Sequence, residues 1–169
     1  MDAGLVVARV VLGLLMAAHG AQKLFSWFGG YGIAGTGGFF ESLGFRPGRL
    51  FATTAGLSEF GGGLLVALGL FGPVGPALVL AVMIVAAMSV HWHNGLFATS
   101  NGIELPLLYA AGAAALTLTG PGRYSLDALL GLSSVWTPAL AWSALSLGII
   151  GGVTNVAVRR TPANAVAAA

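Results

Sequence analysis

Among the ionisable side chains that lie in or beside strongly apolar segments of this 169-residue chain, five are candidates for chemistry. An ionisable residue inside a membrane segment costs free energy, so by default it faces the bundle interior and a partner. His19 and Lys23 are four residues apart and share one face of the first apolar segment. The remaining candidates are Glu59, His91 and Glu104. Such a set of imidazole, ammonium and carboxylate groups could bind a metal, bind a quinone headgroup, or fix how helices pack.

The composition indicates that these groups belong to a membrane protein. Hydrophobic residues make up 57% of the chain, charged residues only 7%, and the mean hydropathy is +0.91. Soluble domains carry about 25% charged residues. The seven basic residues form no stripe, so we expect no nucleic-acid partner. Cysteine is absent, which excludes disulfides, thiolate metal sites and thiol redox chemistry within the chain.

Five apolar windows are candidates for helices that cross a bilayer, each of which needs about 20 mostly apolar residues. The predicted fold is an all-α integral membrane protein, with a four-helix transmembrane bundle and a fifth C-terminal transmembrane helix. The fourth window is short, and residues 24–50 form a long connection rich in glycine and aromatic residues. The windows cover residues 3–23, 51–71, 75–93, 104–119 and 138–158.

The connections add two expectations. Aromatic side chains concentrate at the headgroup level of membranes, so we expect residues 24–50 to lie at the interface. Within them, residues 39–43 are predicted to form a short amphipathic piece on the membrane surface. Residues 161–169 form a tail of small residues for which the sequence predicts disorder.

Basic residues are distributed unequally between the two membrane sides that five spans would create. We call the side of the N-terminus side A and the opposite side, where the first helix ends, side B. Side A holds Arg9 and Arg123, which predicts that side B is cytoplasmic. The basic residues on side B are Lys23, Arg46, Arg49, Arg159 and Arg160.

Depth along the helices places most polar candidates together near side B. At about 1.5 Å per residue, His19 lies roughly 6 Å inside the side-B boundary and Glu59 roughly 12 Å inside it. Lys23, His91 and Glu104 lie at the boundary itself. A carboxylate as deep as Glu59 must pair with a cation or stay protonated. This convergence predicts one polar pocket that contains all five residues.

Each of these residues also has a simpler interpretation. His19 could be hydrogen-bonded to a neighbouring helix, and Lys23 could extend its ammonium to the headgroups. Glu104 could complete an N-terminal capping box with Asn101. His91 and His93 are about 200° apart around a helix, so only one of them can face inward.

Arg9 lies toward side A, far from this group, and its nearest candidate partner is Asp127. We interpret both as structural residues. The histidine and glutamate spacing contains no tight metal-binding motif, so we predict no metal site.

Ordered motifs along residues 5–130 resemble the DoxX family of small bacterial membrane proteins. The opening of the family is similar to Arg9-x-x-Leu12-Gly13 followed by His19-Gly20-x-x-Lys23-Leu24-Phe25. Further matching motifs are Gly44-Phe45, Glu59-Phe60-Gly61-Gly62-Gly63, Leu68-Gly69-Leu70, Val90-His91-x-His93-Asn94-Gly95-Leu96-Phe97, Gly102-Ile103-Glu104-Leu105-Pro106 and Gly120-Pro121-Gly122-Arg123-x-Ser125-Leu126-Asp127. The resemblance implies a four-helix membrane domain over residues 1–130, with residues 138–158 as an addition. It also selects His91 as the inward histidine, because His91 stands four residues before Gly95.

The resemblance further implies a multi-pass subunit of the bacterial cytoplasmic (inner) membrane that serves redox, oxidative-stress or sulfur metabolism. Family members are similar to the membrane subunit of a thiosulfate:quinone oxidoreductase. The implied partners are therefore the lipid bilayer and soluble redox or sulfurtransferase proteins, with a quinone as the candidate cofactor. Whether the chain is itself an enzyme stays open. The alternatives are a non-enzymatic membrane scaffold with a structural polar network and, less favoured, a small-molecule or proton transporter.

A GxxxG pair in the fifth window, Gly148 and Gly152, is typical of close helix packing in membranes. It could serve the chain's own bundle or a homo-oligomer.

Overall fold

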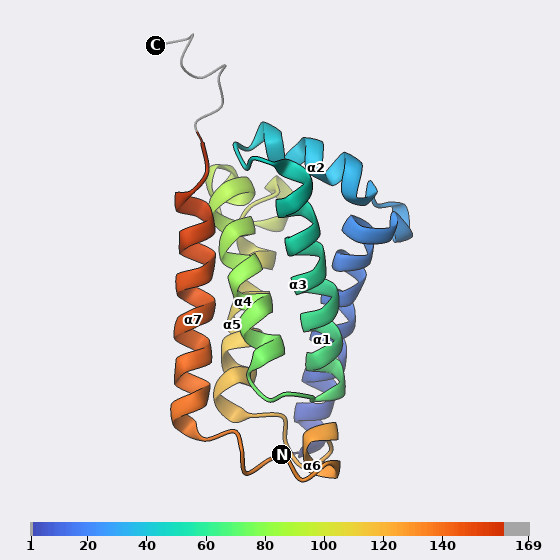
Figure 1. Cartoon of the computed structure of the whole chain (residues 1–169), viewed down its shortest axis with the longest axis vertical. Helices are drawn as coiled ribbons and strands as arrows, with labels where there is room; N and C mark the ends of the chain where they lie inside the picture. The colour runs from blue at the N-terminus through green and yellow to red at the C-terminus, as the bar shows by residue number, and fades with distance from the viewer. Residues whose placement is uncertain (1, 161–169) are drawn as a thin grey trace.

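The computed structural model describes residues 2–160, which form helices and no β-strand. Five long helices run alternately up and down, as Figure 1 shows: α1 (Asp2–Phe25), α3 (Gly48–Leu68), α4 (Val74–Ala86), α5 (Glu104–Thr119) and α7 (Pro138–Ala157). Helix α4 continues through a π-helical turn, η2 (Ala87–His91), and a 3-10 turn, η3 (Trp92–Asn94). The short elements are η1 (Trp27–Gly29), α2 (Gly32–Ser42), η4 (Ala98–Ser100) and α6 (Leu126–Leu129). The predicted tail, residues 161–169, lies outside the described residues.

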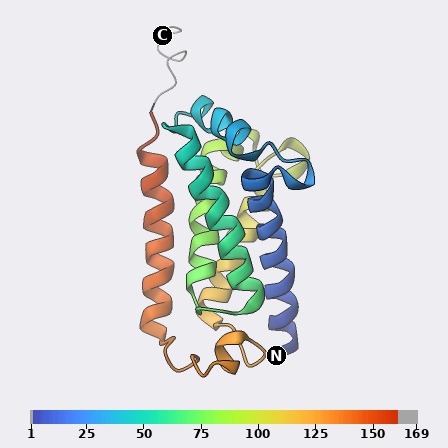
Figure 2. The same ribbon diagram turned by 45° about the vertical axis from the view of Figure 1, so that its right-hand side comes forward.

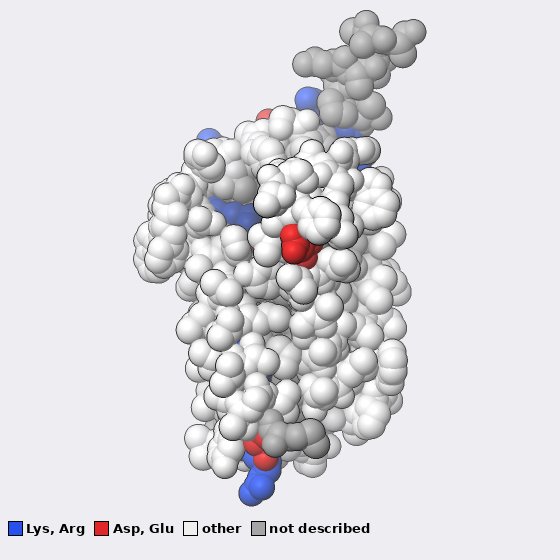
Figure 3. All heavy atoms as spheres, turned by 180° about the vertical axis from the view of Figure 1, so that it is seen from behind, with Lys and Arg blue, Asp and Glu red and all other residues white. Residues whose placement is uncertain are grey.

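The helices have the length and composition of membrane spans, which confirms the prediction of an all-α integral membrane protein. Among the described residues, four helical segments are long and apolar enough to cross a bilayer: Asp2–Phe25, Gly48–Leu68, Val74–Asn94 and Pro138–Ala157. Helix α5 is apolar but has only 16 residues. On the face shown in Figure 3, the charged side chains gather toward the two ends and leave an uncharged belt between them.

Helices α1 and α3 pack backbone against backbone. A Cβ atom added to Gly13 would lie 2.5 Å from the carbonyl oxygen of Gly63, and one added to Gly20 would lie 2.3 Å from the amide nitrogen of Phe60. Small residues allow this approach, as they do in many membrane helix pairs. The residue before Gly63, Gly62, faces α4 instead, because a Cβ there would lie 3.1 Å from the Gly75 carbonyl oxygen. Neighbouring glycines on α3 therefore serve two different helix contacts.

Helix α7 belongs to the same bundle and packs on α4. Cβ atoms added to Gly148 and Gly152 would each lie 2.8 Å from a backbone oxygen of α4, at Ala77 and Ala81. Both glycines are buried. The structure therefore uses the GxxxG pair for packing within the chain, and the surface that we considered for a homo-oligomer is covered by α4.

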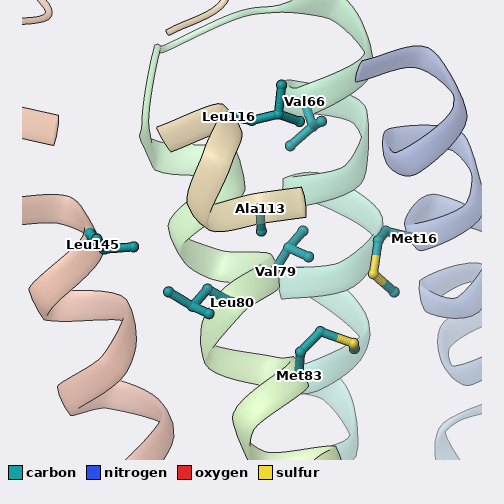
Figure 4. Packing of buried hydrophobic residues seen from close by; sticks show 8 residues of the cluster. All are labelled: Met16, Val66, Val79, Leu80, Met83, Ala113, Leu116 and Leu145. Atoms are coloured by element: carbon teal, nitrogen blue, oxygen red, sulfur yellow. The ribbon is translucent and has the colours of Figure 1, made fainter. Parts of the chain in front are cut away.

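The apolar core lies between α1, α3, α4, α5 and α7, as Figure 4 shows. Met16 of α1, Val79 of α4 and Ala113 of α5 are almost completely buried. The complete buried cluster is Met16, Val66, Val79, Leu80, Met83, Ala113, Leu116 and Leu145. This cluster joins all five long helices, including those that contribute to the candidate site described below.

The connection between α1 and α3 contains more helix than the sequence predicted. Residues 39–42 of the predicted piece are the C-terminal part of α2, and Leu43 is its C-cap. Helix α2 has 11 residues and lies across one end of the bundle in Figures 1 and 2. Four glycines of α2 disfavour a helix in isolation, which is why the sequence pattern did not predict it. Packing compensates for this, because Gly37 lies against the backbone of Arg49 at the start of α3.

Candidate functional site

An ion pair between α1 and α3 is the central feature of the candidate site. The ammonium Nζ of Lys23 donates a hydrogen bond to Oε2 of Glu59 over 2.6 Å. The Glu59 side chain is 3% exposed and that of Lys23 is 24% exposed. Because a buried carboxylate without a partner is very costly, Lys23 satisfies the main electrostatic requirement of this position. The sequence-based expectation that Glu59 faces the bundle interior agrees with this geometry.

The close contact of α1 and α3 positions the pair. Lys23 follows Gly20 by three residues, and Glu59 follows Gly56 by three residues. A Cβ at Gly20 would meet the backbone of Phe60, and a Cβ at Gly56 would lie 2.8 Å from the side chain of Leu24. The two glycines let the helices approach closely at this level, so the lysine side chain needs to reach only across the interface.

The ion pair lies in the wall of a cavity of about 250 Å³. Aromatic side chains of α2, α3 and their connection, including Phe39, Phe40, Phe45 and Phe51, supply much of the lining. The remaining walls come from α4, its π-helical turn and α7. Polar groups are few, and they come from Lys23, Thr54, Ser58, Glu59, Ser89, His91 and Asn155. A mostly apolar pocket with a small number of placed polar groups is the usual form of a small-molecule site.

His91 is the inward histidine, as the family resemblance implied. It lines the cavity, whereas His93 is exposed and is not part of the lining. His91 Nδ1 lies 2.8 Å from the carbonyl oxygen of Asn101, so this nitrogen donates the hydrogen bond, because a carbonyl oxygen only accepts. This bond ties the end of the π-helical turn to the connection that leads into α5.

His19 lies outside the cavity lining. Its ring is exposed on the protein surface and makes an edge-to-face contact with Tyr109 of α5, with ring centroids 6.2 Å apart. The shared face with Lys23 predicted one wall of a common pocket. The two side chains instead diverge, since Lys23 turns to α3 and His19 to α5.

Glu104 also lies outside the cavity lining. Its Oε2 accepts a hydrogen bond of 2.7 Å from the backbone N–H of Ala98. The capping box with Asn101 does not form, because the Asn101 N–H bonds to the Ala98 carbonyl oxygen instead. Glu104 therefore holds the connection that contains η4, and the structure brings three of the five predicted pocket residues to one cavity: Lys23, Glu59 and His91.

Arg9 and Asp127 both lie toward the opposite end of the bundle and form no ion pair with each other. Arg9 is 4% exposed and donates from Nη2 to the Tyr124 carbonyl oxygen. Asp127 is completely buried, and its two oxygens accept the N–H groups of Phe71 and Gly72 at 2.9 and 2.6 Å. Instead of pairing with each other, Arg9 and Asp127 thus each form hydrogen bonds to backbone groups. Each of them holds the connection after α5, and Asp127 also holds the turn before α4.

Neutral polar residues of the cavity escaped the sequence analysis. Ser89 and Asn155 are isolated polar residues in apolar spans, and depth counting was applied only to ionisable groups. The same counting places both near side B, since Ser89 stands two residues before His91 and Asn155 two residues before the end of α7. Among residues 2–160, no group of three or more His, Asp or Glu side chains is arranged to hold a metal ion.

A second cleft adjoins the cavity at Lys23 and Phe39. Gln22, Tyr31 and Thr36 line it together with glycines of the α1–α2 connection. Lys23 and Phe39 line both this cleft and the cavity. Lys23 thus contributes to a cleft beside the α1–α2 connection and to the apolar cavity.

The fold and this site define a multi-pass helical membrane protein with an ion pair in the wall of an apolar cavity. The chain belongs to the DoxX family, whose family model matches residues 4–92. It is also 30% identical over 129 residues to the inner membrane protein YqjF of Escherichia coli (strain K12), a match that covers 76% of this chain and 93% of that protein. No solved structure matches the chain. Both the family and the predicted location in the bacterial inner membrane are thereby confirmed.

Proposed function

We propose that this DoxX-family protein is an inner-membrane subunit that binds a quinone-class molecule in the cavity beside Lys23 and Glu59. In this proposal the protein also anchors soluble redox partners, such as sulfurtransferases, at side B. It carries out no sulfur transfer itself, because the chain contains no cysteine and such a step would take place on a partner.

The observation that carries the proposal is the position of the buried ion pair in the cavity wall. A ligand in the cavity would meet aromatic and aliphatic side chains over most of its surface and the Lys23–Glu59 pair at one side. A quinone has this distribution, with an apolar ring and chain and carbonyl oxygens that accept hydrogen bonds. Ammonium groups only donate, so Lys23 is suited to a carbonyl oxygen.

The size of the cavity supports a ligand of limited bulk. Its volume of about 250 Å³ is close to the lower bound of roughly 300 Å³ for small-molecule pockets. One ring system would fill most of such a space. The chain of a membrane quinone would then lie along apolar lining or in the bilayer.

Side B also supports the anchoring role. The connections at this end carry exposed apolar and aromatic residues, among them Trp92, Leu96 and Phe97 beside the end of the cavity that His91 lines. A soluble partner bound there would lie close to the candidate quinone site.

Ligand-dependent stability tests the quinone proposal. The full chain is reconstituted in lipid nanodiscs, and its melting temperature is measured with and without menadione or a short-chain ubiquinone. We expect a quinone-dependent rise, which Glu59→Gln reduces. Glu41→Gln is the matched control, because Glu41 lies on α2 outside the cavity lining. An unchanged melting temperature of the unsubstituted protein at every quinone concentration would contradict the proposal.

A second candidate function is a membrane scaffold in which the ion pair is purely structural. The pair joins α1 to α3 across their closest contact, which favours this alternative. The scaffold predicts that Glu59→Gln lowers the ligand-free melting temperature, while stress resistance of cells falls only in proportion to the amount of folded protein. Quinone binding with a selective loss in the variant separates the two candidates.

A further inference from the structure

We propose that the C-terminal end of α7 and the α2–α3 connection together form a binding site for the headgroup phosphate of an anionic phospholipid. The site consists of three exposed arginines, Arg46, Arg159 and Arg160. None of them lines the cavity beside Lys23 and Glu59. The site therefore goes beyond the proposed function and does not depend on it.

Backbone contacts bring the three arginines together from two distant parts of the chain. The N–H of Arg160 donates a hydrogen bond of 2.9 Å to the carbonyl oxygen of Gly44, and the two segments lie side by side in Figures 1 and 2. A Cβ atom on Gly44 would lie 2.9 Å from Cγ of Arg159. Arg46 follows Gly44 by two residues, so their Cα atoms are at most about 7 Å apart. Gly44 has a φ of +95°, which favours glycine at this contact.

The three positive charges have no acidic partner in the described part of the chain. None of the arginines forms an ion pair among residues 2–160. Glu41, the acidic residue of the neighbouring helix α2, accepts a hydrogen bond of 3.1 Å from the Gly48 N–H instead. The other acidic side chains, Asp2, Glu59, Glu104 and Asp127, have their partners elsewhere. The site is thus available to an external anion.

The depth of the arginines in the membrane favours a lipid as the source of that anion. Arg159 lies two residues after the end of the α7 span, and Arg46 lies two residues before the start of the α3 span. Both are therefore at the level of the headgroups, where guanidinium groups bind phosphate oxygens through paired hydrogen bonds. Leu50 and Val158, which are 60% and 55% exposed, offer apolar surface nearby for acyl chains. Inorganic phosphate would use the arginines alone.

A phosphate bound to Arg46 and Arg159 would join α7 to the α2–α3 connection. The residue before Arg46, Phe45, lines the cavity, and so does Asn155 of α7. Anything that binds only the folded protein raises its stability. We therefore expect the anionic lipid to raise the melting temperature by holding these two segments together.

The test measures the melting temperature of the full chain in a non-ionic detergent, with added phosphatidylglycerol, phosphatidylcholine or inorganic phosphate. Lipid dissociation constants are measured in parallel. The double variant Arg46→Gln, Arg159→Gln is compared with Arg49→Gln, Arg123→Gln, which removes the same charge. Arg49 lies against Gly37 of α2, and Arg123 lies at the opposite end of the bundle.

We expect phosphatidylglycerol to raise the melting temperature of the unsubstituted protein more than the other two additives do. The variant without Arg46 and Arg159 should bind this lipid at least about tenfold more weakly, since hydrogen bonds to charged groups are lost. The control variant should keep its affinity. Both variants should keep the melting temperature measured without added lipid, because all four arginines are exposed.

Four results would overturn this site. Equal stabilisation by phosphatidylcholine would show that the anionic charge is not recognised, and equal stabilisation by inorganic phosphate would replace the lipid by a free anion. Equal loss of affinity in the two double variants would show a general effect of net charge. Absence of any effect of phosphatidylglycerol would also overturn it, and an acidic protein that co-purifies only when Arg46 and Arg159 are present would then be the partner. All four results leave the quinone site intact, because menadione binding tests that site separately.

Discussion

Gly20 of α1 and Phe60 of α3 lie so close that a Cβ atom on Gly20 would be 2.3 Å from the Phe60 amide nitrogen. This contact sets the spacing at which Lys23 reaches Glu59 one turn further along α1. The site therefore depends on the glycine at position 20 as well as on the two charged side chains.

The first prediction concerns this helix contact. Gly20→Ala should lower the stability of the protein by about 1–3 kcal/mol, because the helices must separate to admit the methyl group. Gly61→Ala is the matched control, since a Cβ there would meet nothing within 4 Å. It should be neutral or stabilising by up to about 1 kcal/mol, as expected for Gly to Ala in a helix. Denaturant unfolding in detergent measures both. Equal effects of the two changes would contradict the packing argument.

The second prediction separates the ion pair from its members. Lys23→Met leaves the Glu59 carboxylate buried without its cation and should cost about 3–5 kcal/mol of stability. The double variant Lys23→Met, Glu59→Leu should be more stable than Lys23→Met, because no unpaired charge remains. Unfolding measurements on Lys23→Met, on Glu59→Leu and on the double variant give the coupling energy between the two side chains. Additive effects would show that the two groups do not interact.

The third prediction concerns the opposite end of the bundle. Each carboxylate oxygen of Asp127 accepts a hydrogen bond from one backbone N–H group. Asp127→Asn replaces one of these two oxygens by an NH₂ group that cannot accept, so the change should lower the stability of the protein by about 1–3 kcal/mol. Asp2→Asn is the control, because Asp2 lies 4.0 Å from an Arg123 side chain that is 84% exposed. Exposed pairs contribute little, so this change should cost less than about 1 kcal/mol. Melting temperatures in nanodiscs test the difference, and quinone binding should be unaffected by either change.

The fourth prediction uses the absence of cysteine, which lets single cysteines be introduced without removing any. If side B is cytoplasmic, a membrane-impermeant thiol reagent added to spheroplasts should label Arg123→Cys and not Arg49→Cys. Both arginines are exposed and lie at opposite ends of the bundle. After cell lysis, both variants should be labelled. Labelling of Arg49→Cys alone in intact spheroplasts would reverse the orientation.

Hydropathy and length were sufficient to predict the long helices, because a bilayer restricts spanning segments to apolar helices. They could not predict α2, whose many glycines become helical only through packing against α3. Depth counting placed Lys23, Glu59 and His91 in the side-B half of the bundle, and they share a cavity.

The depth of a residue along the bundle does not determine, however, in which direction around the helix its side chain points. His19 therefore turned out to face α5, and Glu104 to bind the backbone of its own connection. Ser89 was missed because depth counting was applied only to ionisable groups, although the residue lines the cavity.

Helix α7 lies outside residues 4–92, the part of the chain that the family model matches, yet its Asn155 lines the cavity. It also covers α4 through Gly148 and Gly152. A chain shortened before Pro138 would keep the ion pair but would expose this side of the cavity directly to acyl chains. If the cavity holds the proposed ligand, the shortened chain should therefore exchange it with the bilayer faster than the full chain does, and relatives with and without an equivalent helix should differ in ligand residence time before they differ in which ligand they recognise.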